Sequence, residues 1–171
     1  TNLDKVLLGR NFAEGKVVKV EDGDTVKIKF GKRTESVRLN LVDTPETVDP
    51  RMGEMPGGKE ASNFTKEMLA NQDVRLVMSR SKDKYGRYVA HVYHNEEDFN
   101  RRLLDEGHAK VRYANLSEDT HKEKEYMNAQ LEAYKQKKGI WNIDEYASPY
   151  SDSGYNKKVA QKVMLDRLRN K

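Results

Sequence analysis

The 171-residue sequence contains no cysteine, and its apolar runs fall well short of the roughly 20 residues that a transmembrane helix needs. Without cysteine, the chain can form neither disulfide bonds nor zinc–thiolate sites, and it has no cysteine nucleophile. The apolar stretch KVLLG near the start is too short for the core of a signal peptide. We therefore expect no membrane span. The lack of cysteine fits a secreted bacterial enzyme, but it fits many cytosolic proteins as well.

Charge is abundant but only slightly unbalanced. The chain has 32 lysines and arginines against 28 aspartates and glutamates, which gives a formal net charge of +4. A basic balance favours a polyanionic partner such as nucleic acid, although the same residues can simply solvate the surface. The length predicts one compact domain with room for an appendage.

Short segments in which apolar and polar residues alternate predict five β-strands. In TVKIKF, the residues Val26, Ile28 and Phe30 alternate with lysines after an Asp-Gly turn that favours a hairpin. A proline, Pro45, ends the third strand because it cannot donate to the strand ladder. The other strands are expected in KVVKV, VRLNL, DVRLVMS and RYVAHVYH.

Three segments with helical spacing follow or interrupt these strands: KEASNFTKEMLAN, DFNRRLLDEG and SEDTHKEKEYMNAQLEAYKQKKG. The third helix should start at Ser117 or Asp119 and end at Gly139, with Trp141 packed under it. The order of elements predicts an α+β fold: a small five-stranded OB-type Greek-key β-barrel with three packed α-helices, plus a C-terminal helical extension.

Composition divides the chain into three parts. Residues 1–15 show no clear period and form an N-terminal segment, residues 16–146 form the barrel domain, and residues 147–171 form a linker and a basic amphipathic helix. The linker is read from SPYSDSGYN and the helix from KKVAQKVMLDRLRNK. The helix either docks on the domain or binds nucleic acid or another partner.

Carboxylates gather at two predicted strand ends, in EDGD and in VDTPE. Such groups repel one another unless a positive charge lies between them, and a hard divalent cation is one solution. If the first and third strands are neighbours, Asp24 and Asp43 can converge on one ion, with the carbonyl of Thr44 as a neutral ligand. Asp22 and Glu46 could then act through water. For either stretch alone, ordinary turn chemistry is the favoured explanation of the carboxylates, and the two stretches together point more strongly to a cation.

Two arginines accompany these carboxylates. Arg38 lies between them, but a regular strand would point it away from Asp43, so the two can share a site only if the strand twists or bulges. Arg87 begins the last strand, in DKYGR. The four histidines, His91, His94, His108 and His121, have no metal-ligand spacing, and His91 and His94 are expected at the surface or at a cap rather than in a zinc site.

The motifs DGDTVK, VRLNLVDTPE and DKYGR, in this order and at these intervals, resemble the staphylococcal nuclease (thermonuclease) family. KEASNFTKEML, EGHAKVRY, the TH that opens the long helix and the IWN after it are similar too. The resemblance covers about residues 16 to 143. It implies an OB-type barrel and a Ca²⁺-dependent phosphodiesterase that cleaves DNA and RNA, single-stranded or locally opened, at the bond to the 5′ oxygen and leaves 3′-phosphate ends.

The resemblance also implies a role for each matching carboxylate. Asp24, Asp43 and the Thr44 carbonyl match the calcium ligands of the family, and Asp22 matches its outer-shell carboxylate. Glu46 matches the residue that is assigned to the attacking water. A monomer that is secreted or held at the bacterial cell surface is expected, with any signal segment outside this chain.

The substrate side of the site is implied in the same way. Arg38 and Arg87 match the two phosphate-binding arginines of the family. Lys84 and Tyr85 match groups that hold a terminal phosphate of the bound nucleotide, and Tyr113 matches an aromatic residue beside the base.

Two departures from the family pattern bear on substrate binding. Asn115 stands where the best-known member has a second tyrosine, and the loop TVDPRMGEMPGG has Arg51 as its single positive charge where that member is rich in lysine. The chief alternative is a nucleic-acid-binding module without activity, since OB-type barrels often hold single strands uncut. An interaction domain that works through the C-terminal helix is a third hypothesis, and it is compatible with activity.

Overall fold

The computed structural model describes residues 12–47, 53–113 and 120–170. The strands of these residues are β1 (Phe12–Asp22), β2 (Thr25–Phe30), β3 (Arg33–Leu39), β4 (Val42–Asp43), β5 (Asp73–Met78), β6 (Tyr88–His94), β7 (Glu97–Asp98) and β8 (Lys110–Val111). The helices are α2 (Gly58–Leu69), α3 (Phe99–Asp105), α4 (Thr120–Lys135) and α5 (Lys157–Arg169), with a 3₁₀ turn at Gly139–Asn142.

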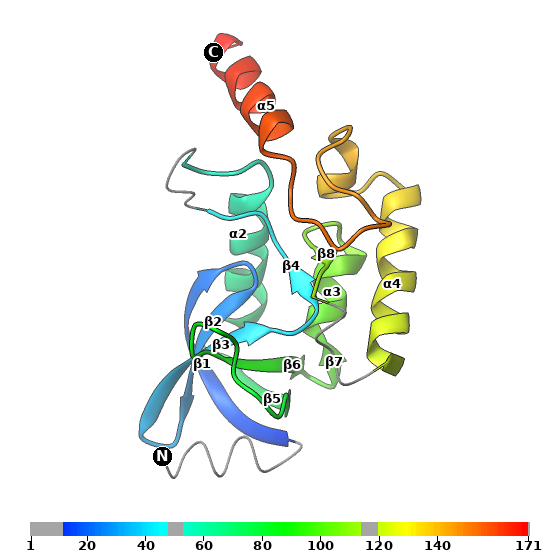
Figure 1. Cartoon of the computed structure of the whole chain (residues 1–171). Helices are drawn as coiled ribbons and strands as arrows, with labels where there is room; N and C mark the ends of the chain where they lie inside the picture. Colours follow the sequence, from blue (N-terminus) through cyan, green and yellow to red (C-terminus); the bar gives the residue numbers. More distant parts are fainter. Residues whose placement is uncertain (1–11, 48–52, 114–119, 171) are drawn as a thin grey trace.

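Five strands close into a barrel (Figure 1). They pair in the order β3-β2-β1-β5-β6, and a parallel pairing of β3 with β6 completes the ring. β1 is long enough to pair with β5 through its first half and with β2 through its second. At Gly15, a side-chain Cβ would lie 2.5 Å from Ile28 Cγ2, so only glycine allows β1 to pass this close to β2. The predicted α+β, OB-type barrel is confirmed.

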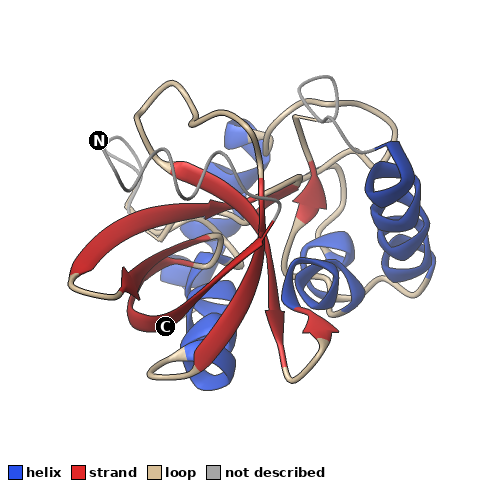
Figure 2. Ribbon diagram, turned by 90° about the horizontal axis from the view of Figure 1, so that it is seen from below, coloured by secondary structure: helices blue, strands red, loops and turns tan. Residues whose placement is uncertain are grey.

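The barrel is filled by the inward-facing residues of its strands, and residues of α2, α3 and α4 extend this core. Helices lie both behind and beside the strands (Figure 2). Along β2, the residues Val26, Ile28 and Phe30 are buried, as their alternation predicts. A second, smaller core contains Trp141, Tyr146 and Ala160. Trp141 packs edge-on against Tyr134 of α4, as expected, with ring centroids 5.6 Å apart. Within the described ranges, no helix is both long and apolar enough to cross a membrane.

The third predicted strand is interrupted. β3 ends at Leu39, Leu41 adopts a left-handed backbone conformation (φ 66°), and the chain resumes as β4, which pairs with β8 instead of continuing the barrel. Leu41 remains buried, so its apolar character was a correct sign of burial but not of a regular strand. This break determines how the chain enters the candidate site.

The chain ends differ in detail from their sequence patterns. β1 begins at Phe12, four residues before the predicted strand. The segment read as a linker packs on the domain, because the ammonium group of Lys110 donates to three of its backbone carbonyls. α5 buries only Ala160 and then projects away from the rest of the molecule (Figure 1). The predicted start of the long helix at Ser117 or Asp119 lies outside the described residues.

Candidate metal and phosphate site

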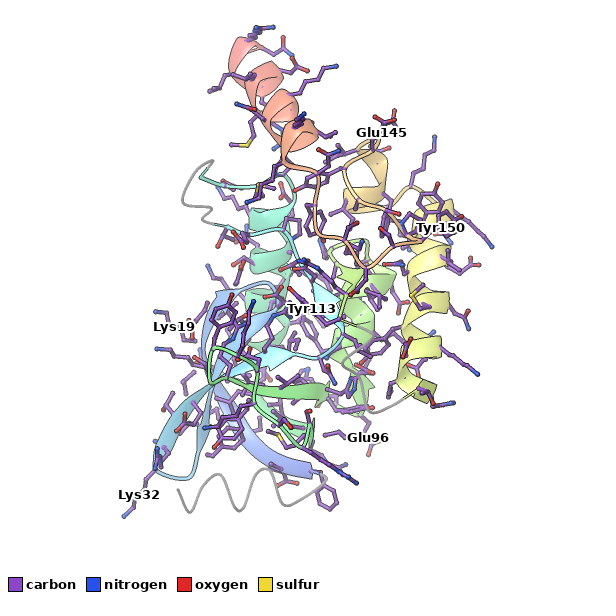
Figure 3. All side chains as sticks on the ribbon, viewed as in Figure 1. Lys19, Lys32, Glu96, Tyr113, Glu145 and Tyr150 are labelled. Atoms are coloured by element: carbon purple, nitrogen blue, oxygen red, sulfur yellow. The ribbon has the colours of Figure 1, made fainter. Side chains whose placement is uncertain are left out.

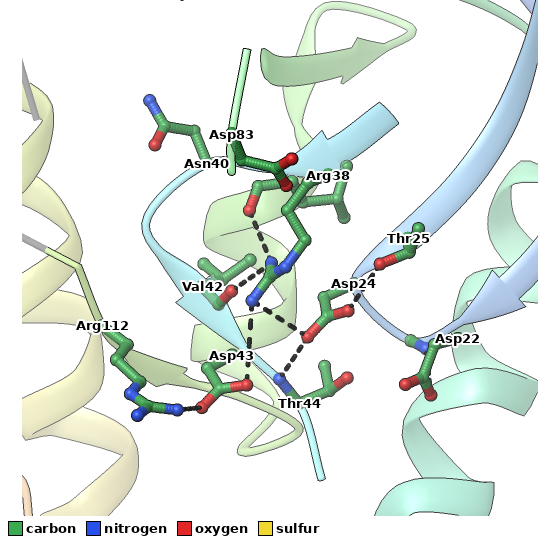
Figure 4. Close-up of polar contacts among 12 residues, drawn as sticks. Asp22, Asp24, Thr25, Arg38, Asn40, Val42, Asp43, Thr44, Asp83 and Arg112 are labelled. Atoms are coloured by element: carbon green, nitrogen blue, oxygen red, sulfur yellow. Dashed lines mark hydrogen bonds and ion pairs between the residues drawn. The ribbon is translucent and has the colours of Figure 1, made fainter. Parts of the chain in front are cut away.

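Two carboxylates, Asp24 and Asp43, meet beside the end of the barrel (Figure 4). Asp24 lies in the β1–β2 turn and is buried. Its Oδ2 accepts from the backbone N–H of Thr44 at 3.0 Å, and its Oδ1 accepts from the hydroxyl of Thr25 at 2.9 Å. Asp43 ends β4, one residue before Thr44. The two turns are therefore joined by a direct hydrogen bond between a carboxylate and the backbone.

The sequence suggested that Asp24 and Asp43 meet because the first and third strands are neighbours. These strands are not neighbours, so this explanation is wrong. β2 lies between β1 and β3, and its pairing with β3 places Thr25 opposite Arg38. A further bond from Leu39 N to Asp24 O, at 2.8 Å, ties the β1–β2 turn to the end of β3. The strand break at Leu41 then turns the chain so that Asp43 comes back toward Arg38. The strand is therefore irregular between Arg38 and Asp43, and a site shared by these two residues required such an irregularity.

Arg38 lies between the two carboxylates. Its Nη2 is 3.3 Å from Asp24 Oδ2 and 3.7 Å from Asp43 Oδ1, while Nη1 donates to the carbonyls of Leu39 and Val42. The Arg38 side chain is only 11% exposed. Burial opposes its charge, but Asp24 and Asp43 outweigh burial and hold the pKa of Arg38 above its ordinary value. Arg38 is therefore a fixed cation with its donors held in place.

Arg112, which the sequence analysis did not select, contacts the same carboxylate from the other side. Its Nη1 lies 3.1 Å from Asp43 Oδ2. Arg112 follows β8, the partner strand of β4, so the pairing of Asp43 with Lys110 brings it within reach. The one available signal was its position in AKVRY, two residues after Lys110 in an extended segment.

The carboxylates are held where their negative charge is unfavourable. Burial and the neighbouring Asp24 raise the pKa of Asp43 to about 6, even with Arg38 and Arg112 beside it. Burial and Asp24 likewise raise the pKa of Asp22 to about 6, against hydrogen bonds from Gly23 and Thr47. The negative charge of these two carboxylates is therefore less favourable in the fold than in water, even with the arginines beside Asp43.

The donor set fits a hard divalent cation. Carboxylate oxygens and a backbone carbonyl are the ligands that Ca²⁺ prefers, and a cluster of buried carboxylates gains most from an added positive charge. The hydroxyl of Thr44 is buried and has no hydrogen-bond partner, so a polar atom at this point is unsatisfied. The described residues do not assemble three or more acidic or histidine side chains into a closed metal cage. Two carboxylates and a carbonyl would therefore leave coordination positions for water or substrate.

Glu46 follows Thr44 by two residues in the chain. Its side chain is exposed, while its carbonyl accepts from Met55 N at 3.0 Å and closes the loop after β4. A Cβ on Gly58 would lie 2.4 Å from that carbonyl, so the start of α2 holds the Glu46 backbone tightly. The backbone is fixed and the carboxylate remains accessible to solvent.

Arg87, Lys84 and Tyr85 form a second group on the loop before β6. Asp83 orients Arg87 through a 2.7 Å contact between Asp83 Oδ2 and Arg87 Nε. The exposed ring of Tyr85 lies under both cations, 5.1 Å from Lys84 Nζ and 5.2 Å from the Arg87 guanidinium. The parallel pairing of Arg38 with Val89 places this loop beside the end of β3. No described contact joins Arg87 directly to the carboxylates.

Tyr113 connects the two arginines of the carboxylate cluster. Its half-exposed ring lies 4.8 Å from the Arg112 guanidinium and 5.9 Å from that of Arg38. Asn115 and Arg51, the positions of the two sequence departures, lie outside the described residues. The prediction for His91 is wrong: it is buried, and its Nδ1 is 2.7 Å from the Tyr126 hydroxyl.

Comparison with known proteins gives relatives along most of the chain. A family model, the staphylococcal nuclease homologue, matches residues 36–143. The chain is 43% identical to the thermonuclease of Staphylococcus hyicus over 129 residues, 74% of this chain and 75% of that protein. It is 46% identical to the thermonuclease of Staphylococcus intermedius over 126 residues, 73% and 74% of the two chains. Endonuclease YncB of Bacillus subtilis (strain 168) is 34% identical over 137 residues, 79% of this chain and 63% of its own.

The raised pKa of Asp22 predicts a pH-dependent effect of Asp22→Asn on stability without divalent cations. Because the folded-state pKa lies above the ordinary value of 3.8, stability from this group is present at low pH and is lost as pH rises from about 4 to about 6. The asparagine side chain of the variant does not ionise, so the variant does not lose this stability as the pH rises. Urea unfolding in EGTA should show a gain on the order of 1–2 kcal/mol at pH 7.5, after allowance for solvent screening, and little at pH 4.5.

The control is Asp144→Asn, at an exposed carboxylate remote in sequence from the site, which should change stability by less than about 0.5 kcal/mol at both pH values. An equal effect of Asp22→Asn at both pH values would contradict the electrostatic account of the cluster.

Proposed function

The chain belongs to the staphylococcal nuclease family, and from that membership we propose that it is a calcium-dependent phosphodiesterase that cleaves DNA and RNA. Hydrolysis would break the bond from phosphorus to the 5′ oxygen and leave 3′-phosphate ends. The observation that carries the proposal is the meeting of Asp24, Asp43 and Arg38 in one buried cluster, in which the pKa of Asp43 is raised. Secretion, a monomeric state and a preference for open strands remain predictions from the resemblance.

In this proposal Asp24, Asp43 and the Thr44 carbonyl would hold Ca²⁺, with Asp22 acting through water. The bound cation supplies positive charge beside the phosphate and raises the acidity of water near it. Asp24 accepts from Thr25 and from Thr44 N, Asp43 accepts from Arg112, and both form ion pairs with Arg38, so their orientation is set before any ligand arrives. Because these groups are already oriented, they need not reorganise as charge develops in the transition state.

The arginines provide the phosphate side of the proposed mechanism. A phosphodiester gains charge on its oxygens as the nucleophile attacks, and guanidinium groups keep their positive charge beside those oxygens at any working pH. The backbone carbonyls of Leu39 and Val42 hold Arg38 Nη1, while Asp83 holds Arg87 through Nε. Both side chains therefore have external supports that limit their movement.

Glu46 is proposed to hold or deprotonate the attacking water. Its carboxylate is exposed on a fixed backbone, which suits a group that must meet a solvent molecule next to the substrate. Lys84 and Tyr85 would contact a terminal phosphate, and Tyr113 would pack beside a base.

The alternative of a pure binding module is weakened by the charges of this site. Carboxylates repel phosphate, so a protein that only binds nucleic acid gains nothing from Asp24, Asp43 and Glu46 beside its arginines. A metal-dependent reaction uses both charge types.

A nuclease assay with defined products tests the proposal. The protein should cleave single- and double-stranded DNA and RNA in Ca²⁺, stop when EGTA is added, and resume when Ca²⁺ is restored. Because cleavage is proposed at the 5′ oxygen, mass spectrometry of the products should find 3′-phosphate and 5′-hydroxyl ends. Full activity in EGTA would reject the metal assignment, and binding without cleavage would favour the module without activity.

Substitution of Glu46 by Gln tests the proposed acid–base role. The amide cannot accept a proton, so kcat should fall by roughly 10²–10⁴ while the protein stays folded. The matched control is Glu67→Gln, at an exposed position on α2, which should keep kcat near the wild-type value. Near-normal turnover of Glu46→Gln would remove this residue from the mechanism.

A further inference from the structure

Residues 148–156, here called the C-terminal strap, contact the candidate site from outside the matched family region, which ends at residue 143. We propose that the strap helps to orient the groups of the site, and that Tyr155 is a positioning residue for the two carboxylates Asp43 and Asp24. This inference rests on the proposed calcium-dependent function. It assigns a role to a segment that sequence analysis reads as a linker.

The strap is anchored to the domain by polar contacts. The fully buried ammonium group of Lys110 donates to the carbonyls of Ser148, Ser151 and Ser153 at 2.8, 2.9 and 2.6 Å. An ammonium group has three protons, so these three carbonyls can satisfy it completely. Gln130 of α4 adds a bond of 2.9 Å to the carbonyl of Pro149. Lys110 lies opposite Asp43 in the β4–β8 pair, so the anchor is placed directly beside the site.

Tyr155 connects the anchored strap to the carboxylates. Its hydroxyl donates to the carbonyl of Asp43 at 2.5 Å, and the N–H of the same peptide group, on Thr44, donates to Asp24 Oδ2 at 3.0 Å. One peptide plane is thus held at both ends, between Tyr155 and Asp24. A hydrogen bond to the carbonyl polarises the peptide and strengthens the bond from its N–H.

A second contact reaches the same carboxylate through Arg112. A Cβ on Gly154 would lie 3.0 Å from Arg112 Nη1 and 3.3 Å from the central guanidinium carbon, so the strap packs its backbone directly on this group. Arg112 Nη1 in turn contacts Asp43 Oδ2. The side chain and the backbone of Asp43 therefore both have supports that depend on the strap.

A third contact reaches Tyr113. The carboxylate of Asp152 accepts from the backbone N–H of Tyr113 at 2.7 Å. Tyr113 has a left-handed backbone conformation (φ 64°), which a bulky residue seldom adopts without an external constraint. The strap thus supports the proposed base-side aromatic residue as well as the metal carboxylates.

These three contacts distinguish the strap from a segment that only covers apolar surface. Each ends on a polar group of Asp43, Arg112 or Tyr113. Partners outside the ligand shell of a metal commonly orient the ligands, and their loss lowers metal affinity. The orientation of Asp43 relative to Asp24 should therefore depend on the Tyr155 hydroxyl.

The test is Tyr155→Phe, which removes the hydroxyl and keeps the ring that packs on Tyr146, with centroids 4.9 Å apart. Calcium affinity is measured by isothermal titration calorimetry on the full chain, without nucleic acid. The expected result is about tenfold weaker Ca²⁺ binding, with a matching rise in the Ca²⁺ concentration for half-maximal nuclease activity. The melting temperature in EGTA reports separately on the fold.

The matched control is Tyr150→Phe, a change of the same kind on the same strap. Tyr150 is exposed and lies beside α4, against the ring of Tyr134 (Figure 3). Its substitution should leave Ca²⁺ affinity unchanged. If Tyr155→Phe binds Ca²⁺ as the wild type does, or lowers only the melting temperature, the positioning role is wrong. If the wild type itself binds no Ca²⁺, the proposed function fails first, and that result is distinct.

Discussion

The candidate site depends on one interaction, the contact of the Arg38 guanidinium with Asp24 and Asp43. Two buried carboxylates within reach of a single cation would otherwise repel each other at a cost of several kcal/mol. Arg38 is itself held by two backbone carbonyls, so its position follows from the path of the chain between β3 and β4. Closure of the barrel by β3 and β6, the break at Leu41 and the β4–β8 pair all determine that path.

The burial of its carboxylates gives the cluster its chemical character. Even with Arg38 and Arg112 in contact, the pKa of Asp43 is raised to about 6, so ionisation of this carboxyl is less favourable in the fold than in water. The fold can hold such a group because many other contacts stabilise the barrel, and a buried charge that is only partly compensated is typical of sites that bind a cation. The cluster therefore lowers the stability of the cation-free protein, and the same unfavourable energy increases its affinity for a cation.

Much of the fold could be predicted from the sequence because local patterns decide it. Alternation identified β2, β5 and β6, helical spacing identified α2 and α4, and the spacing of motifs identified the family. The left-handed conformation of Leu41 could not be predicted, because a leucine between apolar neighbours reads as a regular strand. That single residue decides whether Arg38 and Asp43 face each other, which is why spacing alone separated them.

The strap shows the same limit at longer range. Its composition of serine, glycine and aspartate is typical of a loop, and nothing local indicates that Lys110, some 40 residues earlier, binds its carbonyls. Arg112 and Tyr155 were missed for this reason, since their contacts with Asp43 span 69 and 112 residues. Contacts of this kind arise from the assembled fold, and sequence periodicity carries no record of them.

The most direct test of this account is a crystal structure of the protein grown with Ca²⁺ and a nucleotide. The account predicts an ion within about 2.3–2.6 Å of carboxylate oxygens from both Asp24 and Asp43 and of the Thr44 carbonyl, with a nucleotide phosphate between the ion and Arg38. An ion bound elsewhere, or the two carboxylates turned to different sides with no ion between them, would contradict it.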